Sequence, residues 1–370
     1  MGTFEPHEDF PAIVIDNGSS TCRAGLAGED IPSCIFSSLV GKRKNLLGED
    51  EFFVGGALQE NRELMALTYP IENGIVVNWE DMMKVWDYVF YSKLSVLTEE
   101  HPILISEPPL NPRGNREKMA QVLFENYRAP ASFVAYQPML TKQAIGLSRG
   151  LMVSIGEGSS HVAPIIDGFI LRQAVRRLDC GGRDLTRHLQ QLLVKQGYSF
   201  TTAHELEIVR ELKEKYCYIP DGNKLSAEVQ SCKLSDGSSI ELDRKVFACP
   251  EILFKPDGVF KAGMSIAEMI FESINDTDID NRSDLLNTIC LSGGTTLCPG
   301  FAERLKKDMY SLSDKKNPIM KIWTLPKRQL HKWIGGSVLG ALSSFNHMWI
   351  TRQEYEEYGP HIFNLRCYGE

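Results

Sequence analysis

Short apolar runs alternate with longer segments of helical periodicity along this chain of 370 residues. The runs at residues 11–15, 103–107 and 151–155 are too short for an ordinary helix, and we expect buried strands there. Between such runs, apolar residues recur three and four positions apart, which is the spacing of an amphipathic helix. Strands that alternate with helices in this way favour an α/β fold with a largely parallel inner sheet.

Several predicted helices begin with a capping signal. Asn78 is placed to cap a helix through Asp81, and Asn111 is expected to cap another with Pro112 in its first turn. Capping boxes, in which Ser or Thr precedes Glu by three positions, start three more helices: Thr202 with Glu205, Ser265 with Glu268, and Thr351 with Glu354.

Two stretches interrupt this alternation. Residues 42–52 are charged and too poor in apolar residues to pack, so we expect a loop there. Residues 220–243 are rich in Asp, Gly, Asn and Ser, and they predict a small inserted subdomain.

Glycine and serine follow the predicted strands at three places. The turns at residues 16–20 and 156–160 each lie between two apolar runs, and residues 293–296 follow a third run. Small residues let backbone N–H groups approach an anion, so three such turns indicate phosphate binding. A single turn of this kind, taken alone, is equally well interpreted as an ordinary surface hairpin.

The charged residues in these turns extend the hypothesis. Asp16 and Glu157 could hold a hydrated Mg²⁺, and Arg23 could reach the same phosphates. For either carboxylate, a turn residue bonded to its own backbone is the competing interpretation. Taken alone, His161 and Gln137 are ordinary buried polar residues. The phosphate-loop motif G-x-x-x-x-G-K-[ST] does not occur.

Composition and charge narrow the class of protein. A hydrophobic content of 43% with 24% charged residues is typical of a folded chain, long enough here for two or more domains. The net charge of −8 disfavours direct binding of nucleic acid. Nine cysteines without C-x-x-C spacing indicate a reducing compartment. The acidic N-terminus has no signal-peptide pattern and no apolar run could span a bilayer, so we expect no membrane insertion.

Eight segments, which follow the same order along the chain, resemble segments of actin and the actin-related proteins over nearly the whole chain. These segments are residues 15–19, 69–74, 115–119, 182–186, 208–210, 291–296, 333–337 and 348–351. The resemblance implies the α/β ATPase fold of actin, Hsp70 and sugar kinases, in which two lobes with duplicated ribonuclease-H-like cores flank a central nucleotide cleft. It places the first lobe at 1–145, with a small insert at 37–70 and completion by 330–370, and the second at 146–329, with an insert at 186–262.

On the family pattern the chain binds ATP or ADP with Mg²⁺, or with Ca²⁺ in vitro. Asp16, Gln137 and Glu157 would hold the metal through water, while Gln137 and His161 would act in hydrolysis. The residues that the resemblance assigns to the nucleotide are Gly18, Ser19, Ser20, Thr21, Arg23, Gly156, Glu157, Gly158, Ser159, Gly182, Arg210, Lys213, Glu214, Gly293, Gly294, Thr295, Leu297 and Gln329.

The chain departs from the family pattern at several of these positions. Ser154 stands where the family has an aspartate, so the carboxylate that orients the attacking water is absent. Loss of one such group costs about 10²–10⁴ in rate. We therefore hypothesise that ATP is chiefly a structural ligand and is hydrolysed slowly or not at all. The other exchanges are Ser20 for glycine, Arg23 for lysine, Glu157 for aspartate, Leu297 for an aromatic residue and Gln329 for lysine.

Regions that the family uses for subunit contacts are changed too. Residues 42–52 and 218–243 are shortened, and Gly258 and Lys261 stand where the plug-like segment starting at Phe254 should be apolar. These changes argue against unrestricted homopolymer growth. The apolar partner cleft is kept, although core packing of a C-terminal helix explains it equally well. Its residues are Ile334, Val338, Leu339, Leu342 and Met348, with Gln143 in place of a tyrosine.

The resemblance favours an actin-like, ATP-binding structural and interaction protein of the cytoskeleton, with reduced hydrolysis and altered or restricted self-polymerisation. Its partners would be other actin-family subunits and actin-binding proteins in the cytoplasm. One alternative is a conventional filament-forming, ATP-hydrolysing actin. Another is a nuclear actin-related subunit of a chromatin-modifying complex. A small-molecule kinase fits least, because the similarity extends beyond the shared ATPase core.

Overall fold

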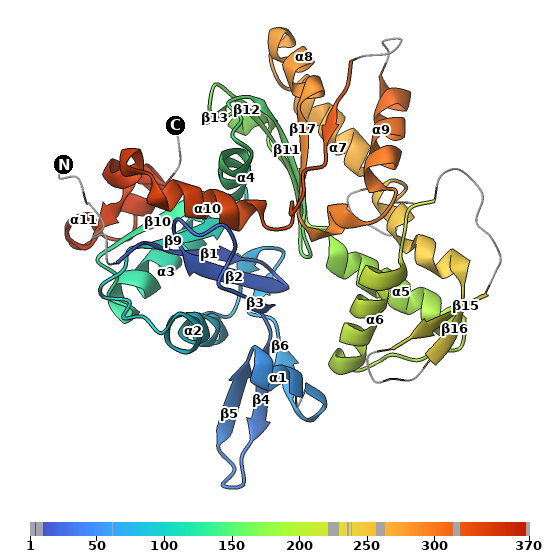
Figure 1. Cartoon of the computed structure of the whole chain (residues 1–370), viewed down its shortest axis with the longest axis horizontal. Helices are drawn as coiled ribbons and strands as arrows, with labels where there is room; N and C mark the ends of the chain where they lie inside the picture. Colours follow the sequence, from blue (N-terminus) through green and yellow to red (C-terminus); the bar gives the residue numbers. More distant parts are fainter. Residues whose placement is uncertain are drawn as a thin grey trace. The chain divides into compact units, whose positions relative to one another are not determined.

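The chain divides into two compact units in a computed structural model that describes residues 4, 10–60, 62–220, 229–234, 237, 239–256, 263–313 and 319–367 (Figure 1). The first unit comprises Met1–Ser148, Ile166–Ile170 and Gln329–Glu370. The second comprises Arg149–Ile165 and Leu171–Arg328. Gly258 and Lys261, which carried the prediction for the plug-like segment, lie outside the described residues.

The first unit is built on a sheet with strand order β19-β10-β9-β1-β2-β3. Its three inner strands β10, β9 and β1 are parallel, which confirms the predicted inner sheet. Strands β19 and β2 flank them as antiparallel strands, and β3 is antiparallel to β2. Every residue of β1 and β9 is buried, as expected for strands covered on both faces. The bounds are β1 Ile13–Asn17, β2 Thr21–Leu26, β3 Cys34–Ser37, β9 Ile103–Glu107, β10 Ala131–Tyr136 and β19 Ile350–Thr351.

Two helices of the first unit, α4 (Gln137–Ile145) and α10 (His331–Ala341), are in direct backbone contact. A Cβ added to Gly335 would lie 1.8 Å from the carbonyl oxygen of Leu140, so only glycine allows this approach. The Trp333 indole fixes α10 to the sheet by donating to the Val14 carbonyl at 3.0 Å. The remaining helices are α1 Gly56–Glu60, α2 Trp79–Asp87, α3 Arg113–Gln121, α11 Arg352–Tyr358 and α12 Ile362–Arg366.

Short helical turns and strands complete the first unit. They are η1 Arg62–Leu64, η2 Tyr88–Leu94, η3 Val122–Asn126, η7 Ser343–Met348, β7 Ile71–Glu72, β8 Ile75–Val76 and β13 Phe169–Ile170.

The prediction of a loop at residues 42–52 is wrong, because this segment forms a hairpin. Strands β4 (Val40–Lys44) and β5 (Asp50–Val54) pair there, and β6 (Ala66–Thr68) extends them to a small sheet. Its charges pair across the strands, with 2.8 Å between Lys42 Nζ and an Asp50 carboxylate oxygen. The Asn45 side chain closes the turn by accepting hydrogen bonds from two backbone N–H groups at 2.9 Å each. Charge therefore indicated a cross-strand ladder rather than an unpacked loop.

The expected cap at Asn111 is also wrong. The N-cap position of α3 is Pro112, and Asn111 instead donates to the buried Glu107 carboxylate at 2.8 Å. The same carboxylate forms an ion pair with Arg116. A buried carboxylate needs donors more than an exposed helix end does, because water can satisfy the latter.

The second unit contains a similar sheet in which β12, β11, β17 and β18 follow one another, and β14 pairs with β12 off this path. Strands β11, β17 and β18 are parallel, and β12 and β14 follow as antiparallel strands. The strand bounds are β11 Gly150–Ile155, β12 Ser160–Ile166, β14 Arg176–Leu178, β17 Ile289–Ser292 and β18 Ile322–Trp323. Both predicted glycine-tipped hairpins, β1–β2 and β11–β12, are thus confirmed as strand pairs.

Helices α5 and α6 pack on a second core with the hairpin formed by β15 and β16, which lies in the predicted inserted segment. The bounds are β15 Val229–Lys233, β16 Ser239–Asp243, α5 Gly182–Lys195, α6 Ala203–Tyr216, α7 Ile266–Asn275, α8 Ile279–Asn287, α9 Phe301–Leu312, η4 Arg172–Ala174, η5 Arg244–Leu253 and η6 Gly294–Leu297. Asn78, Thr202, Ser265 and Thr351 cap their helices as predicted. No described helix is long and apolar enough to cross a membrane.

Candidate functional site

Asp16 at the end of β1 is held on both carboxylate oxygens. It pairs in register with Arg23 on β2, whose Nη1 donates to Oδ2 at 3.2 Å. Ser106, near the end of the parallel neighbour β9, donates to Oδ1 at 2.7 Å. Asp16 is buried, so these contacts replace the hydrogen bonds that water would otherwise make.

The turn after β1 is closely built. A Cβ added to Gly18 would lie 2.5 Å from the Thr21 carbonyl oxygen, so the turn requires glycine. The Ser19 hydroxyl accepts a hydrogen bond from the Gly74 N–H at 2.8 Å. Ser19 and Ser20 are both buried. The Ser19 hydroxyl, which was expected to face phosphate, is therefore positioned by a neighbouring segment of the same unit.

Lys332 adds a cation that the sequence analysis missed. It lies near the start of α10, and its Nζ donates to Gln137 Oε1 at 2.8 Å. Gln137 in turn donates to Ser106 Oγ at 3.4 Å, which links it to Asp16. Burial lowers the pKa of Lys332 to about 8; Asp16 opposes this shift and Arg23 adds to it. We call Asp16, Arg23, Ser106, Gln137 and Lys332 the Lys332 cluster.

The sequence contained a signal for Lys332. It is the only charged side chain among residues 329–342, a stretch that otherwise reads as a buried apolar helix. A lone charge in such a stretch needs a partner inside the protein.

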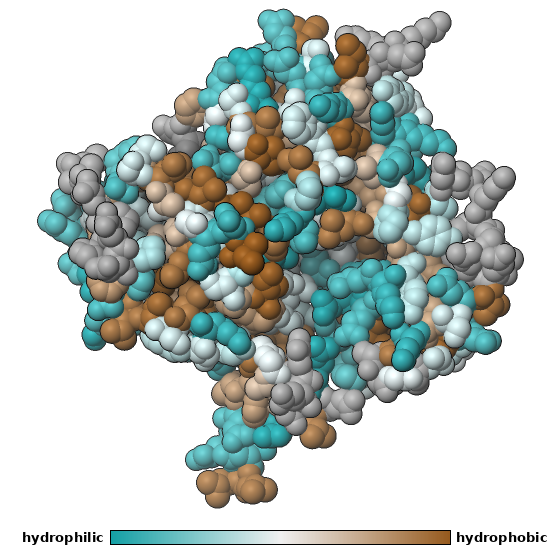
Figure 2. Space-filling model, in the orientation of Figure 1, coloured by the Kyte–Doolittle hydropathy of each residue, from teal (hydrophilic) through white to brown (hydrophobic). Residues whose placement is uncertain are grey.

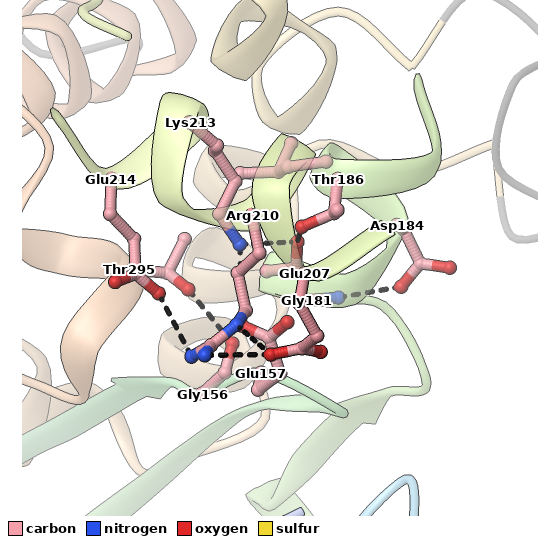
Figure 3. A network of polar contacts seen from close by, with 12 residues as sticks. Gly156, Glu157, Gly181, Asp184, Thr186, Glu207, Arg210, Lys213, Glu214 and Thr295 are labelled. Carbon is pink, nitrogen blue, oxygen red and sulfur yellow. Dashed lines mark hydrogen bonds and ion pairs between the residues drawn. The ribbon is translucent and has the colours of Figure 1, made fainter. Parts of the chain in front are cut away.

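In the second unit, glycine-rich segments from three places in the sequence come together (Figure 3). The Gly156 carbonyl accepts hydrogen bonds from the Gly182 N–H and the Thr295 hydroxyl, each at 2.9 Å. A Cβ on Gly293 would lie 2.3 Å from the Ile155 carbonyl oxygen, and this residue has a φ of +89°. Glycine is therefore required here by both contact and backbone conformation.

Side chains of helix α6 stand over these segments (Figure 3). Lys213 Nζ donates to the Gly182 carbonyl at 2.8 Å and lies 3.3 Å from a Glu157 carboxylate oxygen. The Arg210 guanidinium reaches two carboxylates, with 2.8 Å to Glu207 and 3.5 Å to Glu214. Glu207 was not predicted, although its position three residues before Arg210 indicated an ion pair along the helix.

Ser154 and His161, which the family pattern connected with hydrolysis, lie opposite each other on β11 and β12. Both are buried. The Ser154 hydroxyl has no hydrogen-bond partner among the described residues. Ser292 on β17 is its register neighbour on the other side. The second unit thus places a neutral hydroxyl where a carboxylate was expected to orient water.

The other predicted residues are more dispersed. Gly158 and Ser159 lie in the turn before β12, and Gly294 and Leu297 belong to η6, where Leu297 is exposed. Gln329 has a buried Oε1 without a partner in the described part of the chain.

The predicted partner cleft divides into two groups. Ile334, Leu339 and Met348 pack against the core, whereas Val338 and Leu342 are exposed. Gln143 on α4 is partly buried.

The described residues contain no group of three or more His, Cys, Asp or Glu side chains that could hold a metal ion. Glu157, one of the predicted metal residues, has a carboxylate oxygen 3.3 Å from Lys213 Nζ.

Comparison with known proteins identifies the family of this chain. The family model described as Actin matches residues 7–368. A curated relative from Neurospora crassa, described as "Actin-like protein", is 42% identical over 371 aligned residues, which cover 96% of this chain and 97% of that protein. The predicted family and its α/β ATPase fold are confirmed by this match. The chain belongs to the actin family.

Proposed function

We propose that this chain is an ATP-binding structural and interaction subunit of a cytoskeletal assembly in the cytoplasm, with slow ATP hydrolysis and restricted self-polymerisation. Proteins of the actin family bind nucleotide with a divalent cation. The observation that carries the proposal is the combination of glycine-built turns in both units with a neutral Ser154 on β11. The turns are suited to holding phosphates, whereas the group needed to cleave them is missing.

Each unit, considered by itself, offers groups that suit a nucleotide. The first unit offers the Gly18 turn and the Arg23 guanidinium for phosphates. The second unit offers Lys213 and Arg210 on α6 together with the Gly182 backbone, and these suit the hydroxyls and edges of a nucleoside. Carboxylates already hold both side chains of α6 in place, so little side-chain entropy would be lost on binding.

The proposal of slow hydrolysis rests on Ser154. A hydroxyl cannot accept a proton from water near neutral pH as a carboxylate can, and His161 beside it is buried between strands. Substituting Ser154→Asp should therefore raise the single-turnover rate of phosphate release about 10²-fold. Ser154→Asn is the matched control, since asparagine is similar in size to aspartate and carries no charge. Wild-type hydrolysis as fast as that of Ser154→Asp would contradict the proposal.

The proposal of an actin-family partner rests on the hairpin of β4 and β5. Its turn carries Leu46 and Leu47, which are 106% and 84% exposed, and Figure 2 shows the tip as an apolar patch at the lowest point of the view. Exposed leucines at a hairpin tip favour contact with another protein. We propose an actin-family subunit as that partner.

Sedimentation with Mg-ATP and salt tests the assembly proposal. The purified chain alone should stay in the supernatant and should enter the pellet with filaments of an ordinary actin. Leu46→Ser with Leu47→Ser should weaken that co-sedimentation, whereas Lys44→Ser beside them should not. Extensive pelleting of the chain alone would favour the conventional filament-forming alternative.

A further inference from the structure

The first unit places positive side chains on both residues that were expected to hold the water shell of the metal. Arg23 donates to Asp16 at 3.2 Å, and Lys332 donates to Gln137 at 2.8 Å. The remaining oxygen of Asp16 accepts from Ser106. A hydrated divalent cation needs these oxygens as acceptors for its water molecules.

The charge of the Lys332 cluster also disagrees with a cation site. It contains one carboxylate, the Arg23 guanidinium and the Lys332 ammonium, so its net charge is positive while Lys332 is protonated. The carboxylate is buried and already paired, which leaves little negative potential for a divalent ion. These residues do not fit the role of holding Mg²⁺ that the family pattern implied for Asp16 and Gln137.

We propose that Lys332 and Arg23 form a fixed cationic site that binds the phosphates of a nucleotide directly and thereby makes nucleotide binding by this chain largely independent of a divalent cation. The inference rests on the proposed nucleotide binding, and it specifies how the charge of the phosphates is neutralised. The ligand class is a nucleoside diphosphate or triphosphate.

The donors required for this role are present. An ammonium has three N–H bonds, of which Lys332 uses one for Gln137 within the part of the chain that the structure describes. The Arg23 Nε is buried and has no partner among the described residues. Hydrogen bonds from cations to phosphate oxygens are about twice as strong as neutral ones. A phosphate placed here would satisfy donors that the protein itself leaves open.

The position of Lys332 is fixed before any ligand arrives. The neighbouring Trp333 is buried and bonded to the Val14 carbonyl on β1, the strand that ends at Asp16. Two residues later, Gly335 holds α10 against α4, the helix that begins at Gln137. The ammonium is therefore attached through rigid elements to the turn of the first hairpin. Preorganised charges of this kind lose little energy to rearrangement when the ligand binds.

The test measures the Kd of ADP and of a non-hydrolysable ATP analogue, by displacement of a fluorescent nucleotide, in millimolar Mg²⁺ and in excess EDTA. The wild-type Kd should change less than about 10-fold between the two conditions. Lys332→Met should raise the Kd in EDTA by a further ~10- to 100-fold, which corresponds to the loss of one charge-assisted hydrogen bond. Lys332→Arg should retain most of the cation independence.

Lys118→Met is the matched control, because Lys118 is an exposed lysine on helix α3 of the same unit. It removes the same charge from the chain and should leave both Kd values unchanged. Thermal unfolding of each variant without nucleotide shows whether Lys332→Met is folded. The wild-type comparison of Mg²⁺ with EDTA does not depend on any variant.

The outcomes separate the two proposals. Tight binding in Mg²⁺ that is lost in EDTA for the wild type overturns the role of Lys332 and leaves nucleotide binding intact. No binding in either condition overturns both. Equal cation dependence of the wild type and Lys332→Met shows that the bond to Gln137 is merely structural, and this also overturns the inference.

Discussion

Replacement of Arg116 by methionine tests whether a buried ion pair holds the first unit together. The Arg116 and Glu107 side chains are both 0% exposed, and Arg116 Nε donates to Glu107 at 2.9 Å. Arg116 also donates to the side chain of Asn364, near the end of the described chain, at 3.0 Å. The methionine would leave a buried carboxylate without its cation, which costs about 3–5 kcal/mol of unfolding free energy.

The loss of unfolding free energy in Arg116→Met should depend on pH. Burial raises the pKa of Glu107, while Arg116 and Asn111 lower it. Without Arg116 the folded-state pKa rises further above the unfolded value of about 4.3. A raised folded pKa favours the folded state below the unfolded pKa, and this contribution is lost as the pH rises through the folded pKa. Arg116→Met should therefore be less destabilised near pH 5 than near pH 8.

Urea unfolding followed by circular dichroism at both pH values provides the measurement. Arg128→Met is the control, since Arg128 pairs with Glu99 at the surface, where both side chains are more than 60% exposed. That change should cost less than about 1 kcal/mol. Adding Glu107→Gln to Arg116→Met should recover part of the loss, because it removes the uncompensated charge. A penalty equal to that of Arg128→Met, or one that does not vary with pH, would refute the reasoning.

Two further predictions concern local structure. Gly335→Ala should destabilise the first unit by at least about 1–3 kcal/mol, because its methyl would overlap the Leu140 carbonyl; Gly114→Ala on α3, where the methyl meets nothing within 4 Å, should be neutral or stabilising in the same urea assay. Thr202→Ala should cost about 1 kcal/mol by removing the cap of α6, and Thr202→Ser should cost little. Backbone N–H groups of Thr202 and Thr201 lower the pKa of Glu205, so the stabilisation by the Glu205 carboxylate should be present above the unfolded pKa of about 4.3 and lost as the pH falls through the folded one. Glu205→Gln should therefore destabilise less in acid than at neutral pH, and an equal cost at both pH values would contradict this.

Local rules predicted the elements well where the competing interactions were weak. The capping residues Thr202, Ser265 and Thr351 act as expected because each side chain accepts a hydrogen bond from a backbone N–H group of its own helix. Asn111 fails the same rule because Glu107, a buried carboxylate, requires a donor. The predicted buried strand at residues 103–107 includes Glu107, but only the fold shows that Asn111 is a donor to this carboxylate.

The hairpin at residues 40–54 illustrates a second limit. Its polar residues were interpreted one at a time, as groups that prefer water. In the structure they are paired across two strands, Lys42 with Asp50 and Arg43 with Glu51. The alternation of opposite charges about eight residues apart was visible, but only knowledge of the turn at Asn45 fixes the register that joins them.

The two units, each considered alone, depart from a hydrolytic site in different ways that have the same consequence. The first unit keeps the Asp16 carboxylate but pairs it with Arg23, so it offers positive charge. The second unit replaces a carboxylate with Ser154 and holds Glu157 beside Lys213. Binding of phosphates requires donors and cations, which both units have, whereas cleavage requires a free acceptor to orient water. Under the function proposed above, the exchanges would preserve the retention of a nucleotide and would remove the means of hydrolysing it. This is the balance expected of a subunit in which the nucleotide serves as a structural ligand.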